Sequence, residues 1–286
     1  MPARSLWSAG AGIALAGAAL AVASGCGSSS ESTVPNVRAE VEAAVRDGLT
    51  KNDPSWCETG ATPRFLEQTI GESDGDPVPV CRLNSVLPGD PFAHEVDFRA
   101  VEVDADRAVV TASVTGGAGD GSTIRIELVL AGDRWKFDHL ADIRIARAKF
   151  DAATRHELVL LGAGETEADC AVERLRRIYD TDELERAFVT GETDGFDAAG
   201  ALCLSRASLI RFMDLALRKG APKDVPKVII ECVSRRIAGS LSTGRLRALF
   251  GAADELEGYF ERLVSAAAKQ CAKDAESGLL PERSPA

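Results

Sequence analysis

Histidine is scarce in this 286-residue chain, and the groupings that usually bind zinc are missing. The three histidines, His94, His139 and His156, are far apart, and no two of the seven cysteines have C-x-x-C spacing. Structural zinc sites commonly draw their ligands from such local groups. The segment HELVL at His156 begins like a zincin helix, but Leu160 stands where the second histidine is needed. We therefore expect no metal site and no cofactor.

Several enzyme signatures are also absent. The chain has no G-x-S-x-G elbow, no G-x-x-x-x-G-K-[ST] phosphate loop, and no G-x-G-x-x-G segment between a predicted strand and a helix. The glycine-rich run GAGDG at 117–121 lies between two predicted strands. We interpret this run as a hairpin loop and not as a phosphate site.

Positive charge is in deficit, because 33 lysines and arginines stand against 44 aspartates and glutamates, giving a net charge of −11. Residues 1–25 contain one base, Arg4, and no acid, so the rest of the chain is more acidic by one unit. Nucleic acid and anionic lipid headgroups would repel such a surface. The expected partners are a protein or a small apolar ligand, and no nucleic acid.

The longest apolar run, at about 9–23, is too short for an ordinary membrane span. It covers about 15 residues, whereas a helix needs roughly 20 to cross a bilayer. Arg4 precedes the run, small residues end it at Ser24-Gly25, and no basic cluster follows. This three-part layout predicts an export signal peptide over residues 1–25.

The end of this signal, ASGC at 23–26, resembles the lipobox of bacterial lipoproteins. The resemblance implies that Cys26 is joined to diacylglycerol and becomes the first residue of the mature protein. Two or three acyl chains anchor a protein firmly to a membrane, since each buried methylene adds about 0.8 kcal/mol to the binding free energy. Residues 26–34 would then be a flexible tether, and the protein would lie on the outer face of the cytoplasmic membrane. The alternative is an ordinary secretory signal with an incidental cysteine.

From 35 to 148 the pattern begins helical and becomes alternating. Apolar residues recur every four positions from Val37 to Leu49, and Thr62-Pro63 favours the start of a second helix. Beyond Cys81, period-two alternation is interrupted by turn signals at 104–106, 116–121 and 131–133. This predicts a four-strand antiparallel meander with one buried face. The mixed segment EVDFRAVEV indicates either a bulge or a strand buried on both sides.

The opening helix, the meander and the closing segment GDRWKFDHL at 132–140 together resemble the nuclear transport factor 2-like, or SnoaL-like, cone folds. The segment WC…TPRFLEQTIG…C before the strands resembles the exported lipoprotein members. The resemblance implies an α+β domain over 35–148 in which helices and a concave sheet enclose a pocket. It implies little about activity, since this fold carries many unrelated functions.

Strand signals are absent after about Phe150, and an internal repeat occupies this half. DCAVERLRRIYDTDELERAF at 169–188 aligns without a gap on ECVSRRIAGSLSTGRLRALF at 231–250. The matched pairs are Cys170/Cys232, Arg174/Arg236, Thr181/Thr243, Leu184/Leu246 and Phe188/Phe250. We expect an all-α domain over 149–278 with two repeats, at about 166–205 and 228–273, and a disordered tail over 279–286.

Six cysteines remain once Cys26 is set aside, and an even number in an exported chain indicates disulfides. Three pairings are open to the last four cysteines. The repeat selects Cys170–Cys203 and Cys232–Cys271, because each copy then holds one crosslink. Cys57 and Cys81 are left to pair in the first domain.

A non-catalytic binding or interaction module at the cell envelope is the principal hypothesis for function. The alternative is an enzyme that uses the cone pocket for general acid/base chemistry on a small apolar substrate, with His139 or Asp97 as the base. Alternation places His139 on the same strand face as Trp135 and Phe137, although a position near the strand's end fits half-exposure equally well. A core filled by Trp135, Phe137 and Leu128 would argue against the enzyme.

Overall fold

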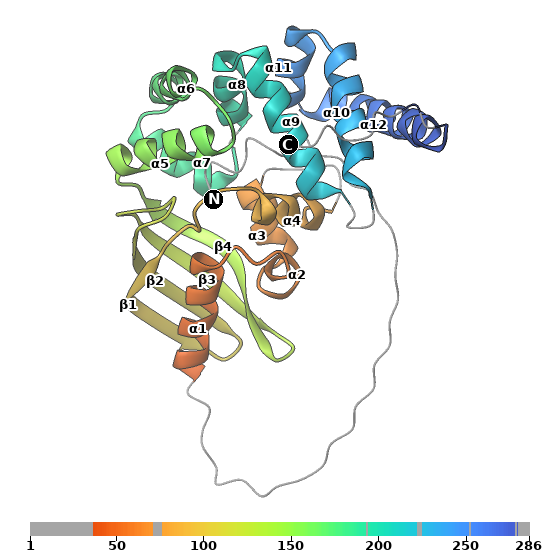
Figure 1. Cartoon of the computed structure of the whole chain (residues 1–286). Coiled ribbons are helices and arrows are strands. Elements are labelled where there is room, and N and C mark those ends of the chain that lie inside the picture. Colours follow the sequence, from red (N-terminus) through yellow and green to blue (C-terminus); the bar gives the residue numbers. More distant parts are fainter. Residues whose placement is uncertain are drawn as a thin grey trace, which may run out of the picture.

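A computed structural model describes residues 37–70, 76–192, 194–221, 225–251, 253–277 and 279. The described chain is an α+β protein in which a four-strand antiparallel sheet is joined to a set of helices (Figure 1). The expected signal peptide, Cys26 and the tether lie outside these residues. The expected tail also lies outside them, apart from Leu279.

The sheet is a simple meander. Its strands are β1 (Glu95–Asp104), β2 (Arg107–Thr115), β3 (Thr123–Ala131) and β4 (Arg134–Arg144), in the spatial order β1-β2-β3-β4. The three predicted turns connect them, and this part of the prediction is confirmed. Alternate side chains of β2 and β3 are buried, because one sheet face packs against helices while the other meets solvent.

Helix α1 (Val37–Thr50) covers the buried sheet face with the predicted stripe Val41, Val45 and Leu49, each no more than 1% exposed. Helices α2 (Trp56–Thr59), α3 (Pro63–Ile70) and α4 (Val78–Val86) follow beside it in Figure 1. The Thr62 hydroxyl accepts a hydrogen bond from the backbone N–H of Phe65 at 3.3 Å, which caps α3 as the sequence indicates.

Two strands depart from strict alternation. In β1 the register shifts between Phe98 and Ala100, which is the bulge that the mixed pattern allowed. In β4, Phe137 stands opposite Leu128, but His139 stands opposite Glu127. One extra residue of β4 is therefore accommodated between Phe137 and His139, which exchanges the faces of His139 and Leu140 until a second register shift follows Leu140.

This bulge changes where His139 points. Leu140 pairs with Ile126 and is buried, so Leu140 takes the inner position that alternation assigned to His139. The His139 side chain is 25% exposed and lies with Glu127, its Nδ1 being 3.8 Å from the Glu127 carboxylate. A bulge is a backbone feature that period-two counting does not register, and this explains the difference.

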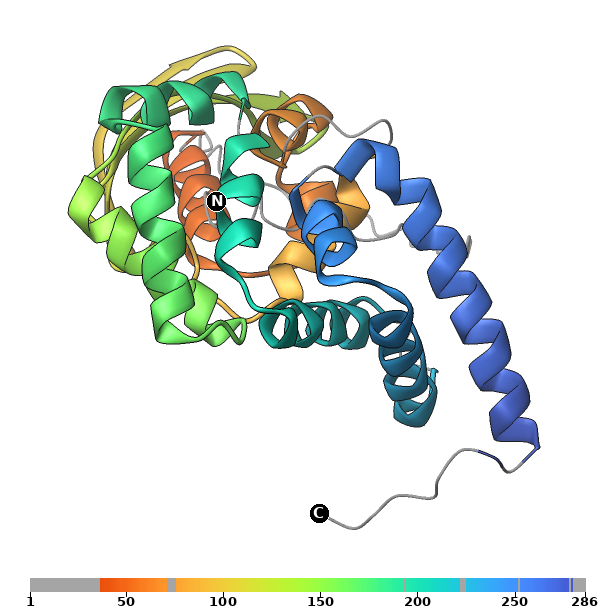
Figure 2. The same cartoon turned by 90° about the horizontal axis from the view of Figure 1, so that it is seen from above.

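Every described secondary-structure element of the second half is a helix (Figures 1 and 2). Its elements are α5 (Arg147–Leu160), α6 (Glu165–Ile178), α7 (Thr181–Thr190), α8 (Asp194–Cys203), α9 (Arg206–Gly220), α10 (Lys227–Ser240), α11 (Thr243–Gly251) and α12 (Ala253–Glu276). Asp180 caps α7 and Ser242 caps α11, each side chain accepting a hydrogen bond from the backbone N–H three residues on. Figure 2 shows α12 along the outer side of this half.

Three disulfides join the six described cysteines in the expected pairs. Cys57–Cys81 links α2 to α4, Cys170–Cys203 links α6 to α8, and Cys232–Cys271 links α10 to α12. The Cα atoms in each pair are 5.7 to 5.9 Å apart, a normal span for a disulfide. In the chain-entropy account, crosslinks over such loops stabilise the fold by at most roughly 3–4 kcal/mol each.

The apolar core continues across residue 149. Helix α7 packs on β4, and its Leu184, Ala187 and Phe188 belong to the same buried cluster as the sheet and α1. A second cluster joins α9 to α12 and includes part of α6. The sheet and the first helices of the second half thus share one core.

Gln68 of α3 closes the free edge of β4. Its side-chain amide donates to the Leu140 carbonyl at 2.9 Å and accepts from the Leu140 N–H at 2.8 Å. The same amide nitrogen donates to the carbonyl of Val189 in α7. The side chain therefore replaces a neighbouring strand and ties α3, β4 and α7 together.

Two buried acids lie at or near the junction between the two halves, Glu185 joining α7 to the end of β4 and Asp151 joining α5 to α6. Glu185, 7% exposed, accepts hydrogen bonds from the Ile145 N–H at 2.7 Å and from Arg144 at 2.8 Å. Asp151, 3% exposed, lies between Arg147 and Arg176 at 3.0 and 2.6 Å. Both carboxylates are paired, as burial of charge requires.

Glu167 of α6 binds the start of α9. Its carboxylate accepts hydrogen bonds from the Ser205 N–H, the Ser208 hydroxyl and the Gly164 N–H at 3.0, 2.5 and 2.9 Å. Partial burial acts to raise the pKa of Glu167, but these hydrogen bonds outweigh it and lower the pKa from 4.5 to about 2. The group therefore favours its ionised form in the folded protein.

Candidate functional site

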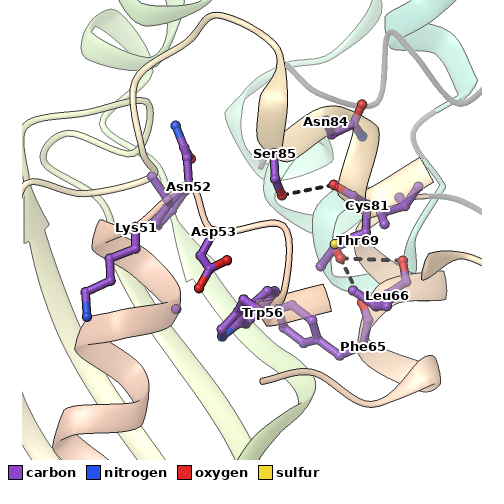
Figure 3. A pocket seen from close by; sticks show the side chains of 13 residues that line it. Lys51, Asn52, Asp53, Trp56, Phe65, Leu66, Thr69, Cys81, Asn84 and Ser85 are labelled. Carbon is purple, nitrogen blue, oxygen red and sulfur yellow. Dashed lines mark hydrogen bonds between the residues drawn. The ribbon is translucent and has the colours of Figure 1, made fainter. Parts of the chain in front are cut away.

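A small cavity lies between the C-terminal end of α1, the segment that follows it, and helices α3 and α4 (Figure 3). Its volume is about 70 Å³. Sites for drug-sized ligands commonly measure roughly 300–1,000 Å³. This cavity therefore suits a small molecule, or one end of a larger molecule.

The segment 51–55 forms one wall because the sequence ends α1 sharply. Pro54 cannot continue a helix. Asp53 accepts hydrogen bonds from the Ser55 N–H at 2.9 Å and the Ser55 hydroxyl at 2.8 Å, which turns the chain into α2. The bond from the Ser55 N–H, followed by the bond from its hydroxyl, lowers the pKa of Asp53 below its ordinary value of 3.8. At neutral pH this rim carries a carboxylate.

Three aromatic rings separate the cavity from the sheet. Trp56, Phe65 and Phe137 meet edge to face, with centroid distances of 6.0, 5.1 and 5.3 Å. Gly48 permits this packing, because a Cβ there would lie 2.7 Å from Phe137 and 2.8 Å from Trp56. Trp56 and Phe65 also line the cavity, together with Leu66, Ile70 and Phe92.

Apolar side chains of the core fill the space over the buried face of the sheet. Phe137 is 0%, Leu128 2% and Trp135 6% exposed, and no described residue that lines the cavity belongs to a strand. The cavity is thus separate from the buried sheet face, where the resemblance implied a pocket.

The polar side chains of the cavity come mainly from α3 and α4. The Thr69 hydroxyl donates to the Phe65 carbonyl at 2.8 Å, and the Ser85 hydroxyl donates to the Cys81 carbonyl at 3.0 Å. Asn84 is 5% exposed, and its Oδ1 has no hydrogen-bond partner. In Figure 3, Asn52 and Asp53 face Thr69, Cys81 and Ser85 across this space.

The candidate bases lie elsewhere. The Asp97 side chain is 65% exposed, pairs with Arg99 at 3.1 Å, and stands opposite Ser113 on the outer sheet face. His139 lies beside Glu127 on that same face. Neither lines the cavity, and the structure does not bring the two together.

The other charged groups near the strand ends also have separate positions. His94 is exposed. Asp138 accepts hydrogen bonds from Thr62 and Arg64, each at 3.0 Å, and so helps to hold α3 against β4. These contacts give Asp138 a structural role.

The residues that do line the cavity were not predicted as site residues. Asp53, Thr69, Asn84 and Ser85 carry no motif, and they come from segments that only folding brings together. The nearest available signal was the Asn-Asp-Pro sequence at 52–54, which predicts a turn and no chemistry.

Among the described residues, no cluster of three or more histidine, cysteine, aspartate or glutamate side chains could hold a metal ion. Within the same ranges, every helix is too short or too polar to cross a membrane. Comparison with protein-family models, with curated proteins and with solved structures finds no match to this chain.

Proposed function

We propose that this protein is an exported lipoprotein that acts as a non-catalytic binding or interaction module at the cell envelope. The observation that carries the proposal is the cysteine arrangement. Six cysteines form three disulfides, and the seventh, Cys26, follows a short apolar segment and small residues. Disulfides persist in oxidising compartments. Lipidation would give Cys26, the one cysteine left over from these three disulfides, a role that requires no second cysteine.

The finer architecture belongs to this proposal. Helices packed on one face of a four-strand meander support a relation to the nuclear transport factor 2-like cone folds. Two segments of matched sequence, each with its own disulfide and a capped short helix, support a two-repeat arrangement of the second half. The matched short helices differ in their packing, since α7 contacts β4 whereas α11 contacts α8.

The position of α1 suggests how an anchored molecule is oriented. The Leu49 carbonyl accepts from the Ala93 N–H, so α1 ends where β1 starts, close to the helical half. Helix α1 therefore begins at the opposite end of the sheet (Figure 1). Residues 27–36, fully extended, span at most roughly 35 Å. The sheet would lie near the lipid, and the helical half would face away toward a partner.

The non-catalytic part of the proposal is supported by the separation of His139 and Asp97 from the cavity. General acid/base catalysis needs a titratable group within hydrogen-bond reach of the reacting atom. Asp53 is the acid at the cavity, and its lowered pKa makes it a poor proton carrier near neutral pH.

Replacement of the lipidation residue tests the anchor. Cys26→Ser should move the protein from the membrane fraction to the soluble fraction and abolish incorporation of a labelled fatty acid. Ser29→Ala, in the same segment, should change neither result. Equal membrane retention of Cys26→Ser, or the absence of lipid on the unsubstituted protein, would contradict the proposal.

A further inference from the structure

We propose that the cavity between α1, α3 and α4 binds a primary ammonium group, either as a small free amine or as the end of a longer apolar molecule. This inference rests on the proposed binding role and is independent of the lipid anchor. It follows from which hydrogen-bonding atoms the cavity offers, from its charge, and from its aromatic wall.

The lining offers acceptors. The hydroxyl protons of Thr69 and Ser85 are already donated to carbonyls of their own helices, so each oxygen retains only lone pairs for a ligand. A ligand that brings N–H donors can therefore hydrogen-bond to these two hydroxyl oxygens, whereas a ligand with acceptors alone cannot.

The charge at the rim favours a cation. Asp53 carries a carboxylate, and both hydrogen bonds from Ser55 are accepted by its Oδ1. Lys51 also borders the cavity, but its ammonium is 2.7 Å from Asp47 and points away from the cavity in Figure 3. The ammonium of this lining lysine is thus paired with Asp47, and an anionic ligand would meet the Asp53 carboxylate and the hydroxyl oxygens of Thr69 and Ser85.

The remaining wall suits the apolar part of such a ligand. Trp56, Phe65 and Phe92 line the cavity, and aromatic faces attract cations as well as alkyl groups. A site for one water needs roughly 10–15 Å³ in the same measure. A cavity of about 70 Å³ therefore accommodates an ammonium with a short alkyl chain.

Titration of the purified full chain, with its three disulfides intact, tests the proposal by NMR. The probes are n-butylammonium, butyltrimethylammonium and butyrate. We expect n-butylammonium to shift the Trp56 indole N–H and the Asn84 amide saturably, while the Trp135 indole serves as an internal reference. Butyltrimethylammonium cannot donate hydrogen bonds and should bind at least fivefold more weakly, and butyrate should not bind.

Two variants localise the binding. Asp53→Asn keeps an acceptor for the turn at Ser55 but removes the charge, and Thr69→Val keeps the side-chain size but removes the hydroxyl acceptor. Each should weaken n-butylammonium binding at least fivefold, whereas Glu67→Gln, exposed on α3, should leave it unchanged.

Equal binding of all three probes, no saturable shift at millimolar n-butylammonium, or unchanged binding by both variants would overturn the assignment. Asp53→Asn keeps the inference testable if Thr69→Val fails to fold. None of these results depends on Cys26, so a failure here is distinguishable from a failure of the lipoprotein proposal.

Discussion

Replacing Gln68 by leucine should destabilise the protein more than a typical substitution at a half-exposed position. The side chain makes three hydrogen bonds, two with Leu140 of β4 and one with Val189 of α7. Leucine preserves the approximate volume but removes all three. The Leu140 backbone groups then lie at a sheet edge without a partner, and Leu140 itself is 5% exposed.

The expected cost can be estimated from these contacts. Three hydrogen bonds at about 1 kcal/mol each give about 3 kcal/mol, and unpartnered buried backbone groups add about 1–3 kcal/mol. Part of this is offset by the burial of a leucine side chain. We therefore expect Gln68→Leu to lower the free energy of unfolding by about 3–5 kcal/mol. Gln68→Glu should have an intermediate effect, because it retains only the bond from the Leu140 N–H.

Urea denaturation with the disulfides intact measures this loss, followed by tryptophan fluorescence and by far-UV circular dichroism. Coincident transitions are needed for the two-state treatment. Glu67→Leu is the matched control on the neighbouring exposed position and should change stability by at most about 0.5 kcal/mol. A loss below about 1 kcal/mol for Gln68→Leu would refute the view that this side chain closes the β4 edge.

The folded pKa of Glu167 lies below its unfolded value of 4.5, so its stabilisation is present above pH 4.5 and is lost as pH falls through about 2. After allowance for solvent screening, Glu167→Gln should lower the free energy of unfolding, measured with urea, by about 1–2 kcal/mol at pH 7. The loss should be much smaller near pH 2. An equal loss at both pH values would contradict the role given to this carboxylate. In Gly48→Ala, the higher helix propensity of alanine should stabilise the protein by about 0.5–1 kcal/mol, but crowding against the aromatic cluster should destabilise it by about 1–3 kcal/mol. The melting temperature should therefore fall. Gly239→Ala, where a Cβ meets nothing within 4 Å, should instead raise stability, and a similar effect of both substitutions would show that crowding at Gly48 is unimportant.

The features predictable from the sequence are those set by local periodicity and turns. The four-residue repeat from Val37 to Leu49 predicts α1 because a helix brings those positions to one face. The three turn signals set the strand boundaries, and Asp180 and Ser242 mark the starts of α7 and α11. Each of these signals acts within a few residues of the structure that it specifies.

The features that escaped prediction depend on long-range contacts. The bulge in β4 exchanges the faces of His139 and Leu140, and it is fixed by pairing with β3 more than by the local sequence. The shared core of the sheet and α7 crosses the boundary that composition indicates near residue 149. The cavity combines residues of α1, α3 and α4, and its acceptor character emerges only when the donors of Thr69 and Ser85 are traced to their carbonyls.

Mass spectrometry of the protein extracted from native membranes, alkylated before and after reduction, tests the central claim most directly. The account predicts an N-terminal peptide that begins at Cys26 and carries a diacylglyceryl group, with the other six cysteines alkylated only after reduction. A peptide that retains residues 1–25 without lipid, or six cysteines alkylated before reduction, would contradict it.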